Sequence, residues 1–192
     1  MIVIDNFYSD PYAVRKAALG LTYDTKSFSA GVESHESVPH KAMTKLSQVI
    51  GDYVWWQSKH DVQCYQSLHG GHKACQRPHE HGDRSAPSHY RQWCAEVTLT
   101  LPEHVSGSLD FFQCKKHGAS ILARHFVEDD FGSEGFRRLF SVPLAFNRCV
   151  LFEANLAHAL SKSAKVGKTL EDGSLTQTFF FFSGYNPDYN NN

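Results

Sequence analysis

Hydrophobic and polar positions follow two different periods along this chain of 192 residues. In the N-terminal part, residues 1–55, apolar side chains recur at helical spacing in two segments. Asp10 before Pro11 marks the first helix start, because the aspartate can cap free backbone amides and proline fits the first turn. The predicted elements are a short strand at residues 2–7 and helices at residues 12–19 and 40–50.

Over residues 60–185 the pattern becomes that of β-strands. From Trp93 to Leu101 every second residue is apolar and most of the others are polar, which is typical of a strand with two unlike faces. We therefore predict a mainly β (α+β) fold, in which N-terminal helices precede a β-rich core that suits a barrel or sandwich. The predicted strands cover residues 62–68, 91–101, 108–113, 138–142, 148–153 and 175–183.

Composition narrows the class of protein. The length fits one domain, residues 1–192, and 41% hydrophobic with 20% charged residues permits a packed core. The formal net charge of −1 predicts no nucleic-acid partner and no anionic membrane surface as partner. The first residues lack the basic stretch of a secretory signal, and no apolar run approaches the roughly 18 residues that span a bilayer. Five cysteines without a C-x-x-C pair predict reduced thiols and a cytoplasmic location.

The candidate chemistry lies in the histidines, of which the chain has 12. His81 and Asp83 are two positions apart, so on an extended backbone both side chains leave the same face. His158, just after the predicted strand at 148–153, can supply a third ligand. Two histidines and one carboxylate on one face of an octahedron are the ligand set of non-haem iron(II) oxygenases. We predict that these three residues bind a divalent metal, iron(II).

Other ligand sets stay open near the same place. His79 is the nearest rival of His81, although it lacks a carboxylate two residues further on. Together with His69, His72 and Cys75, these histidines form a cluster that could hold zinc or copper. Their spacing does not match a zinc-finger pattern with two close ligand pairs.

The order of the motifs resembles that of a known family. H-x-D is followed by T-L-T-L-P, S-G-S-L-D-F-F, N-R-C-V-L-F-E-A-N-L-A-H and a final F-F-F-F over residues 79–182. This order resembles the iron- and 2-oxoglutarate-dependent dioxygenases of the prolyl-hydroxylase-like, small bacterial type. The resemblance implies a double-stranded β-helix, with the family's H-x-D on His81 and Asp83 and its distal histidine on His158. It also implies oxidation, by hydroxylation, of a small-molecule or peptide substrate with O2 and 2-oxoglutarate.

One position departs from the family. A basic residue usually starts its last strand and binds the far carboxylate of 2-oxoglutarate, but Ser174 stands there in this chain. Lys162, Lys165 or Lys168 from the preceding loop could replace it, and Arg148 from a neighbouring strand is a further candidate. Two alternatives therefore remain: a metal-dependent oxidase or oxygenase on the same scaffold without 2-oxoglutarate, and a non-catalytic β-barrel binding protein.

Overall fold

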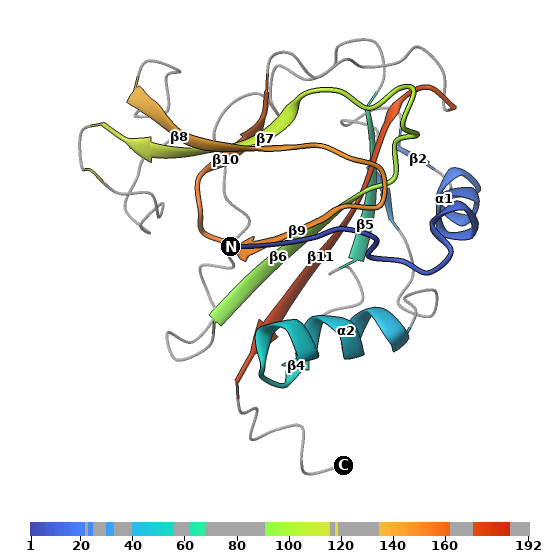
Figure 1. The fold of residues 1–192 in the computed structure, drawn as a ribbon, viewed down its shortest axis with the longest axis horizontal. Helices are drawn as coiled ribbons and strands as arrows, with labels where there is room; N and C mark the ends of the chain where they lie inside the picture. The colour runs from blue at the N-terminus through green and yellow to red at the C-terminus, as the bar shows by residue number, and fades with distance from the viewer. Residues whose placement is uncertain are drawn as a thin grey trace.

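The computed structural model arranges two antiparallel sheets against one another, with two helices beside the larger sheet (Figure 1). The structure describes residues 1–21, 23–24, 30–32, 40–55, 62–67, 91–115, 118, 135–161 and 171–184. For four of these stretches it describes the backbone but not the side chains: residues 23–24, 30–32, 40–41 and 62–67. Neither helix in this part of the chain is long and apolar enough to cross a membrane.

The two sheets are built from strands distant in sequence. The larger sheet contains β1 (Ile2–Ile4), β2 (Tyr23–Asp24), β3 (Ala30–Val32), β4 (Val54–Trp55), β5 (Val62–Ser67), β6 (Arg91–Thr98), β9 (Cys149–Glu153) and β11 (Ser174–Ser183). The smaller sheet contains β7 (Ser108–Cys114), β8 (Phe136–Pro143) and β10 (His158–Leu160). Their orders are β1-β9-β6-β11-β5-β3-β2, with β4 also paired to β11, and β10-β7-β8. From β8 to β11, successive strands alternate between the two sheets, which is the winding of a double-stranded β-helix.

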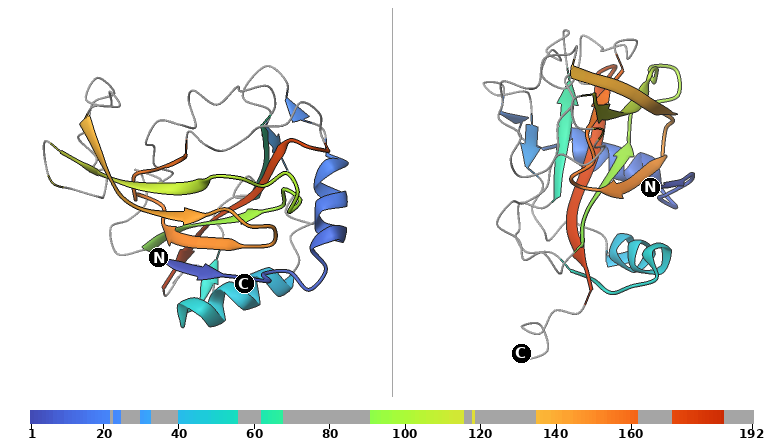
Figure 2. Two further views of the ribbon diagram at one scale, coloured as in Figure 1. Left: turned by 45° about the horizontal axis from the view of Figure 1, so that its top comes forward. Right: turned by 90° about the vertical axis from the view of Figure 1, so that its left-hand side faces the viewer.

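Both predicted helices are confirmed, and local chemistry explains their ends. In α1 (Pro11–Leu19), the side chain of Asp10 accepts a hydrogen bond from the amide of Ala13 at 3.0 Å. The second helix, α2 (His40–Ile50), ends at Gly51, whose φ of 74° is left-handed and favours glycine. Figure 2 shows α1 standing at one end of the strands and α2 running beneath them.

The outer face of the larger sheet packs against the helices. On this side β6 contributes alternate residues, and β11 contributes Phe179 and Phe181, both almost completely buried. The helix α2 contributes Ala42 and Leu46. The other members of this cluster include Phe7, Trp93, Ala95, Val97, Leu99, Leu151 and Leu175.

The inner face of the larger sheet packs against the smaller sheet. A second buried cluster joins Cys94, Val150 and Phe152 from the larger sheet to Leu109 and Phe111 from the smaller one. The two inner faces therefore enclose a shared interior, and the predicted double-stranded β-helix with N-terminal helices is confirmed. Burial on both faces also explains why four phenylalanines follow one another in β11.

The differences from the prediction concern short elements. The first strand ends at Ile4 and does not reach residue 7, because Asn6 has a left-handed φ of 54°. The strand β10 was not predicted at all. Its three residues are too few to show a period of two.

The side chain of Asn147 hydrogen-bonds the N-terminal segment to the loop before β9. Asn147 has a φ of 62°, and its side-chain oxygen accepts from the amide of Tyr8 at 2.8 Å. Its side-chain nitrogen donates to the carbonyl oxygen of Tyr8 at 2.9 Å. The amide thus satisfies both backbone groups of one buried residue.

Asn147→Ala should lower the free energy of unfolding by about 2–4 kcal/mol, because two buried backbone groups would lose their partners. Urea denaturation followed by circular dichroism measures this. Asn6→Ala is the matched control, since Asn6 has a similar φ of 54° but lies exposed at the surface. Equal losses in the two variants would show that backbone conformation, and not the hydrogen bonds, accounts for the effect.

Candidate metal centre

His158 lies inside the barrel, at the start of β10. Its register partner on β7 is Phe111, and its side chain has no exposed surface. The ring of Phe152 packs edge-on against it at 4.7 Å between centroids, and that of Phe111 lies at 6.1 Å. The imidazole is thus held in place by aromatic packing from both sheets.

A backbone contact fixes the tautomer of this histidine. Nδ1 of His158 lies 2.7 Å from the carbonyl oxygen of Leu156. A carbonyl oxygen can only accept a hydrogen bond, so the proton belongs on Nδ1 and the lone pair of the neutral ring on Nε2.

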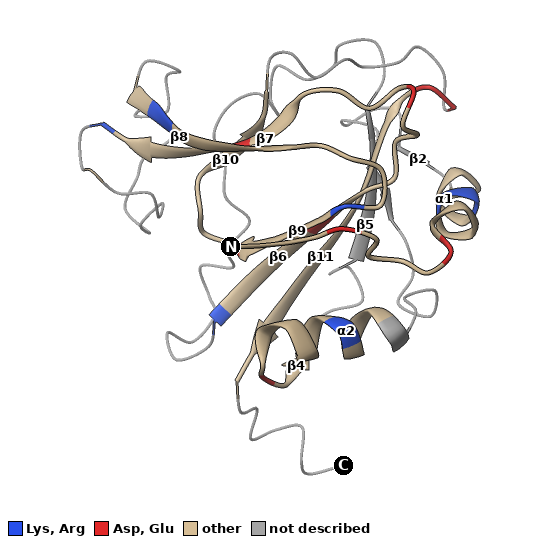
Figure 3. Cartoon of the chain, viewed as in Figure 1, with Lys and Arg blue, Asp and Glu red and all other residues tan. Residues whose placement is uncertain are grey.

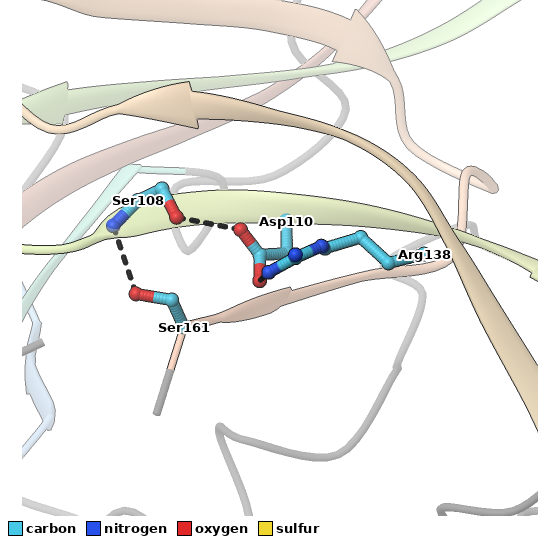
Figure 4. A network of polar contacts seen from close by, with 4 residues as sticks. All are labelled: Ser108, Asp110, Arg138 and Ser161. Carbon is cyan, nitrogen blue, oxygen red and sulfur yellow. Dashed lines mark hydrogen bonds and ion pairs between the residues drawn. The ribbon is translucent and has the colours of Figure 1, made fainter. Parts of the chain in front are cut away.

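A polar network on the smaller sheet holds β10 in register (Figure 4). The amide of Ser108 donates to Oγ of Ser161 at 2.9 Å, and the amide of Ser161 donates back to the carbonyl oxygen of Ser108 at 2.8 Å. Oγ of Ser108 donates to Asp110 at 2.6 Å, and Arg138 contacts the other oxygen of that carboxylate at 3.3 Å. These contacts tie the end of β10 to the start of β7, which keeps His158 opposite its partner.

Glu96 is an ionisable neighbour of His158 inside the barrel. Its Oε1 lies 3.7 Å from Nε2 of His158, and its side chain is 15% exposed. Acidic and basic residues are sparse along the described strands (Figure 3). Burial raises the pKa of the Glu96 carboxyl from its ordinary value of 4.5 to about 7. The pKa of the neighbouring Cys94 thiol is also raised. The main cause is the burial of Cys94 itself, and the negative charge of Glu96 adds to it.

The surroundings of His158 fit a divalent metal ion. Metal-binding histidines usually donate their other ring N–H to a carbonyl or carboxylate, and His158 does so to Leu156. The Nε2 side of the ring faces the Glu96 carboxylate. Among the residues described here, no group of three or more metal-binding side chains occurs. A metal site at His158 would therefore need further ligands from other parts of the chain.

The remaining predicted site residues divide into two groups. His81, Asp83 and Lys168 lie outside the described residues, so their roles stay predictions. Ser174 begins β11, at the place expected from the sequence. Arg148, the last of these residues, directly precedes β9.

The guanidinium of Arg148 is already engaged. Its Nε and Nη2 donate to the two carboxylate oxygens of Asp5 at 2.6 and 3.0 Å, and its Nη1 donates to the carbonyl oxygen of Pro143 at 2.9 Å. The hydrogen bond from Arg148 holds the pKa of Asp5 below its usual value. Any ligand of Arg148 would have to compete with this bidentate pair.

From the sequence, Glu96 could pair with Arg91 or contact a substrate, and nothing in the sequence decides between these roles. The alternation in β6 separates Glu96 from the apolar residues on the helix side, but it does not distinguish an interior carboxylate from an exposed one. The distance to His158 depends on the packing of β6 against β10, and no local pattern reports that packing.

Comparisons with known proteins agree with this fold. No family model matches the chain, and no curated protein matches its sequence. A truncated form of the viral collagen prolyl hydroxylase from Paramecium bursaria Chlorella virus-1 is similar, with a TM-score of 0.55 and 16% identity over 96% of this chain and 90% of that one. HygX from Streptomyces hygroscopicus, solved with nickel, 2-oxoglutarate and hygromycin B, has a TM-score of 0.55 and 16% identity over 95% and 82%. The chain therefore shares the fold of these two proteins.

Proposed function

We propose that this chain is a non-haem iron(II)- and 2-oxoglutarate-dependent oxygenase that oxidises, by hydroxylation, a small-molecule or peptide substrate. The observation that carries the proposal is His158, buried inside a double-stranded β-helix with its Nδ1 proton held by a backbone carbonyl. The fold supports it, since one structural neighbour is a prolyl hydroxylase and another was solved with nickel and 2-oxoglutarate. The proposed cytoplasmic location rests on the cysteine pattern alone.

The proposed ligands of the iron are His81, Asp83 and His158. Iron(II) bound by two histidines and one carboxylate keeps open positions and supplies redox chemistry with O2. The protein's part is to orient the ligands and exclude water. Phe111 and Phe152 do both for His158, because they pack on its ring and leave it no exposed surface.

Lys168 is the proposed anchor for the far carboxylate of 2-oxoglutarate. Of the basic candidates for this role, Arg148 is already bonded to Asp5. A lysine can supply the charge of the usual arginine, although not its two-pronged geometry.

Glu96 favours a second candidate, a metal-dependent oxidase or oxygenase on the same scaffold that does not use 2-oxoglutarate. A co-substrate with two carboxylates would approach His158 beside another carboxylate, and like charges oppose such an approach. The two candidates share the metal centre and differ in the co-substrate.

Removing any one of the three proposed ligands should abolish tight metal binding. Anaerobic titration of the metal-free protein with iron(II) should give dissociation constants raised by more than about 100-fold in His81→Ala, Asp83→Ala and His158→Ala, since even outer partners of a ligand contribute about 10- to 100-fold. Circular dichroism checks that each variant is folded. His79→Ala is the matched control and should bind iron normally. Loss of binding in His79→Ala but not in His81→Ala would show that the ligand assignment is wrong.

Adding 2-oxoglutarate to the anaerobic iron(II) protein should produce a visible metal-to-ligand charge-transfer band. In Lys168→Ala the dissociation constant of 2-oxoglutarate should rise by at least about 10-fold, because one charge-assisted contact contributes roughly 1.5–3 kcal/mol, while iron binding is unchanged. Arg148→Ala should leave the band unchanged. Iron binding without any band would favour the second candidate, and absence of metal binding would leave a non-catalytic binding barrel.

A further inference from the structure

Glu96 occupies a place where a carboxylate needs a cation. It lies within β6, and its register partners on the neighbouring strands are Thr178 of β11 and Val150 of β9. Both partners are buried, and neither can neutralise a negative charge. Burying a charged carboxylate without an opposite charge is unfavourable, so Glu96 is expected either to take up a proton or to have a charge partner on the inner side.

The histidine ring is not a sufficient partner by itself. Among the residues that the structure describes, His158 is the one group within ion-pair distance of Glu96. The 3.7 Å between Oε1 of Glu96 and Nε2 of His158 is too long for a hydrogen bond. A doubly protonated His158 would therefore meet the carboxylate without the direct bond that makes a buried ion pair favourable.

The same spacing suits two ligands of one metal ion. Carboxylate oxygens and imidazole nitrogens bind metals at about 2.0–2.2 Å, so two such atoms on one ion lie about 3 Å apart at a right angle and about 4 Å apart when opposite. The separation of 3.7 Å lies within this range. The Nε2 of His158 carries the lone pair that a metal needs, because its Nδ1 donates to Leu156.

We propose that Glu96 is a further ligand of the metal ion that His158 binds. This inference rests on the proposed metal centre and changes its ligand set to two histidines and two carboxylates. Such a set leaves two positions of an octahedron for other molecules, where the three-residue set leaves three. Glu96 as a ligand therefore favours the second candidate function, because a chelating 2-oxoglutarate and O2 together need three positions.

Cobalt(II) is a suitable probe, because its visible absorption reports the number and kind of its ligands. Glu96→Gln keeps the size of the side chain and removes its charge, so it should fold at least as well without metal. Its dissociation constant for cobalt(II) should rise by at least about 10-fold, since a ligand contributes more than an outer partner does. Its cobalt absorption bands should also change in position and intensity. Thermal unfolding of the metal-free protein confirms that the variant is folded.

Glu153→Gln is the matched control. Glu153 lies on β9, next to β6, and is opposite Trp93, which faces the helices and not the interior. This variant loses the same charge from the same sheet, and it should keep the affinity and the spectrum of the wild type.

Glu96→Asp separates coordination from simple attraction. It keeps the charge but shortens the side chain by one methylene, so a ligand is lost while most of the electrostatic attraction remains. We expect its cobalt spectrum to resemble that of Glu96→Gln. A wild-type spectrum and affinity in either Glu96→Asp or Glu96→Gln would overturn the proposal.

The two proposals can fail separately. If His158→Ala loses cobalt(II) and Glu96→Gln does not, the metal centre stands and Glu96 is not a ligand. If the wild-type chain itself takes up no cobalt(II), the metal centre and the role of Glu96 are both wrong.

Discussion

The interior between the two sheets is lined by buried apolar side chains, and this constraint governs where polar groups can lie. Cys94, Val150 and Phe152 from the larger sheet meet Leu109 and Phe111 from the smaller one. Any charged or hydrogen-bonding side chain that enters this space has to be satisfied there. A polar side chain that is retained in this interior therefore points to a specific structural or functional role.

His158 satisfies this constraint through the architecture of β10. The strand is only three residues long, yet it is paired with β7 and tied to it by the contacts between Ser108 and Ser161. The carbonyl of Leu156 then fixes the ring proton. A ligand held by packing and by hydrogen bonds on a sheet is positioned more accurately than one on a loop, which suits a site that must keep open positions for other molecules.

The sequence predicts the parts of this structure that local patterns control. The Asp10 cap and the alternation in β6 report their own elements, so α1 and the central strand are found correctly. The strand β10 depends on its pairing with β7, and the approach of Glu96 to His158 joins residues 62 positions apart in the chain. No local period encodes either contact. His81 and Asp83, which are recognised by spacing and by motif order, remain predictions because they lie outside the described residues.

The central claim is that His158 binds a divalent metal through Nε2. The most direct test is nitrogen NMR of protein labelled in its histidine rings, with zinc(II) as a diamagnetic probe. Before zinc is added, we expect His158 to show a protonated Nδ1 and an unprotonated Nε2. On addition, its Nε2 resonance should shift as it binds the metal, while Nδ1 stays protonated. A His158 resonance that does not respond to zinc(II), while other histidines do, would contradict the claim.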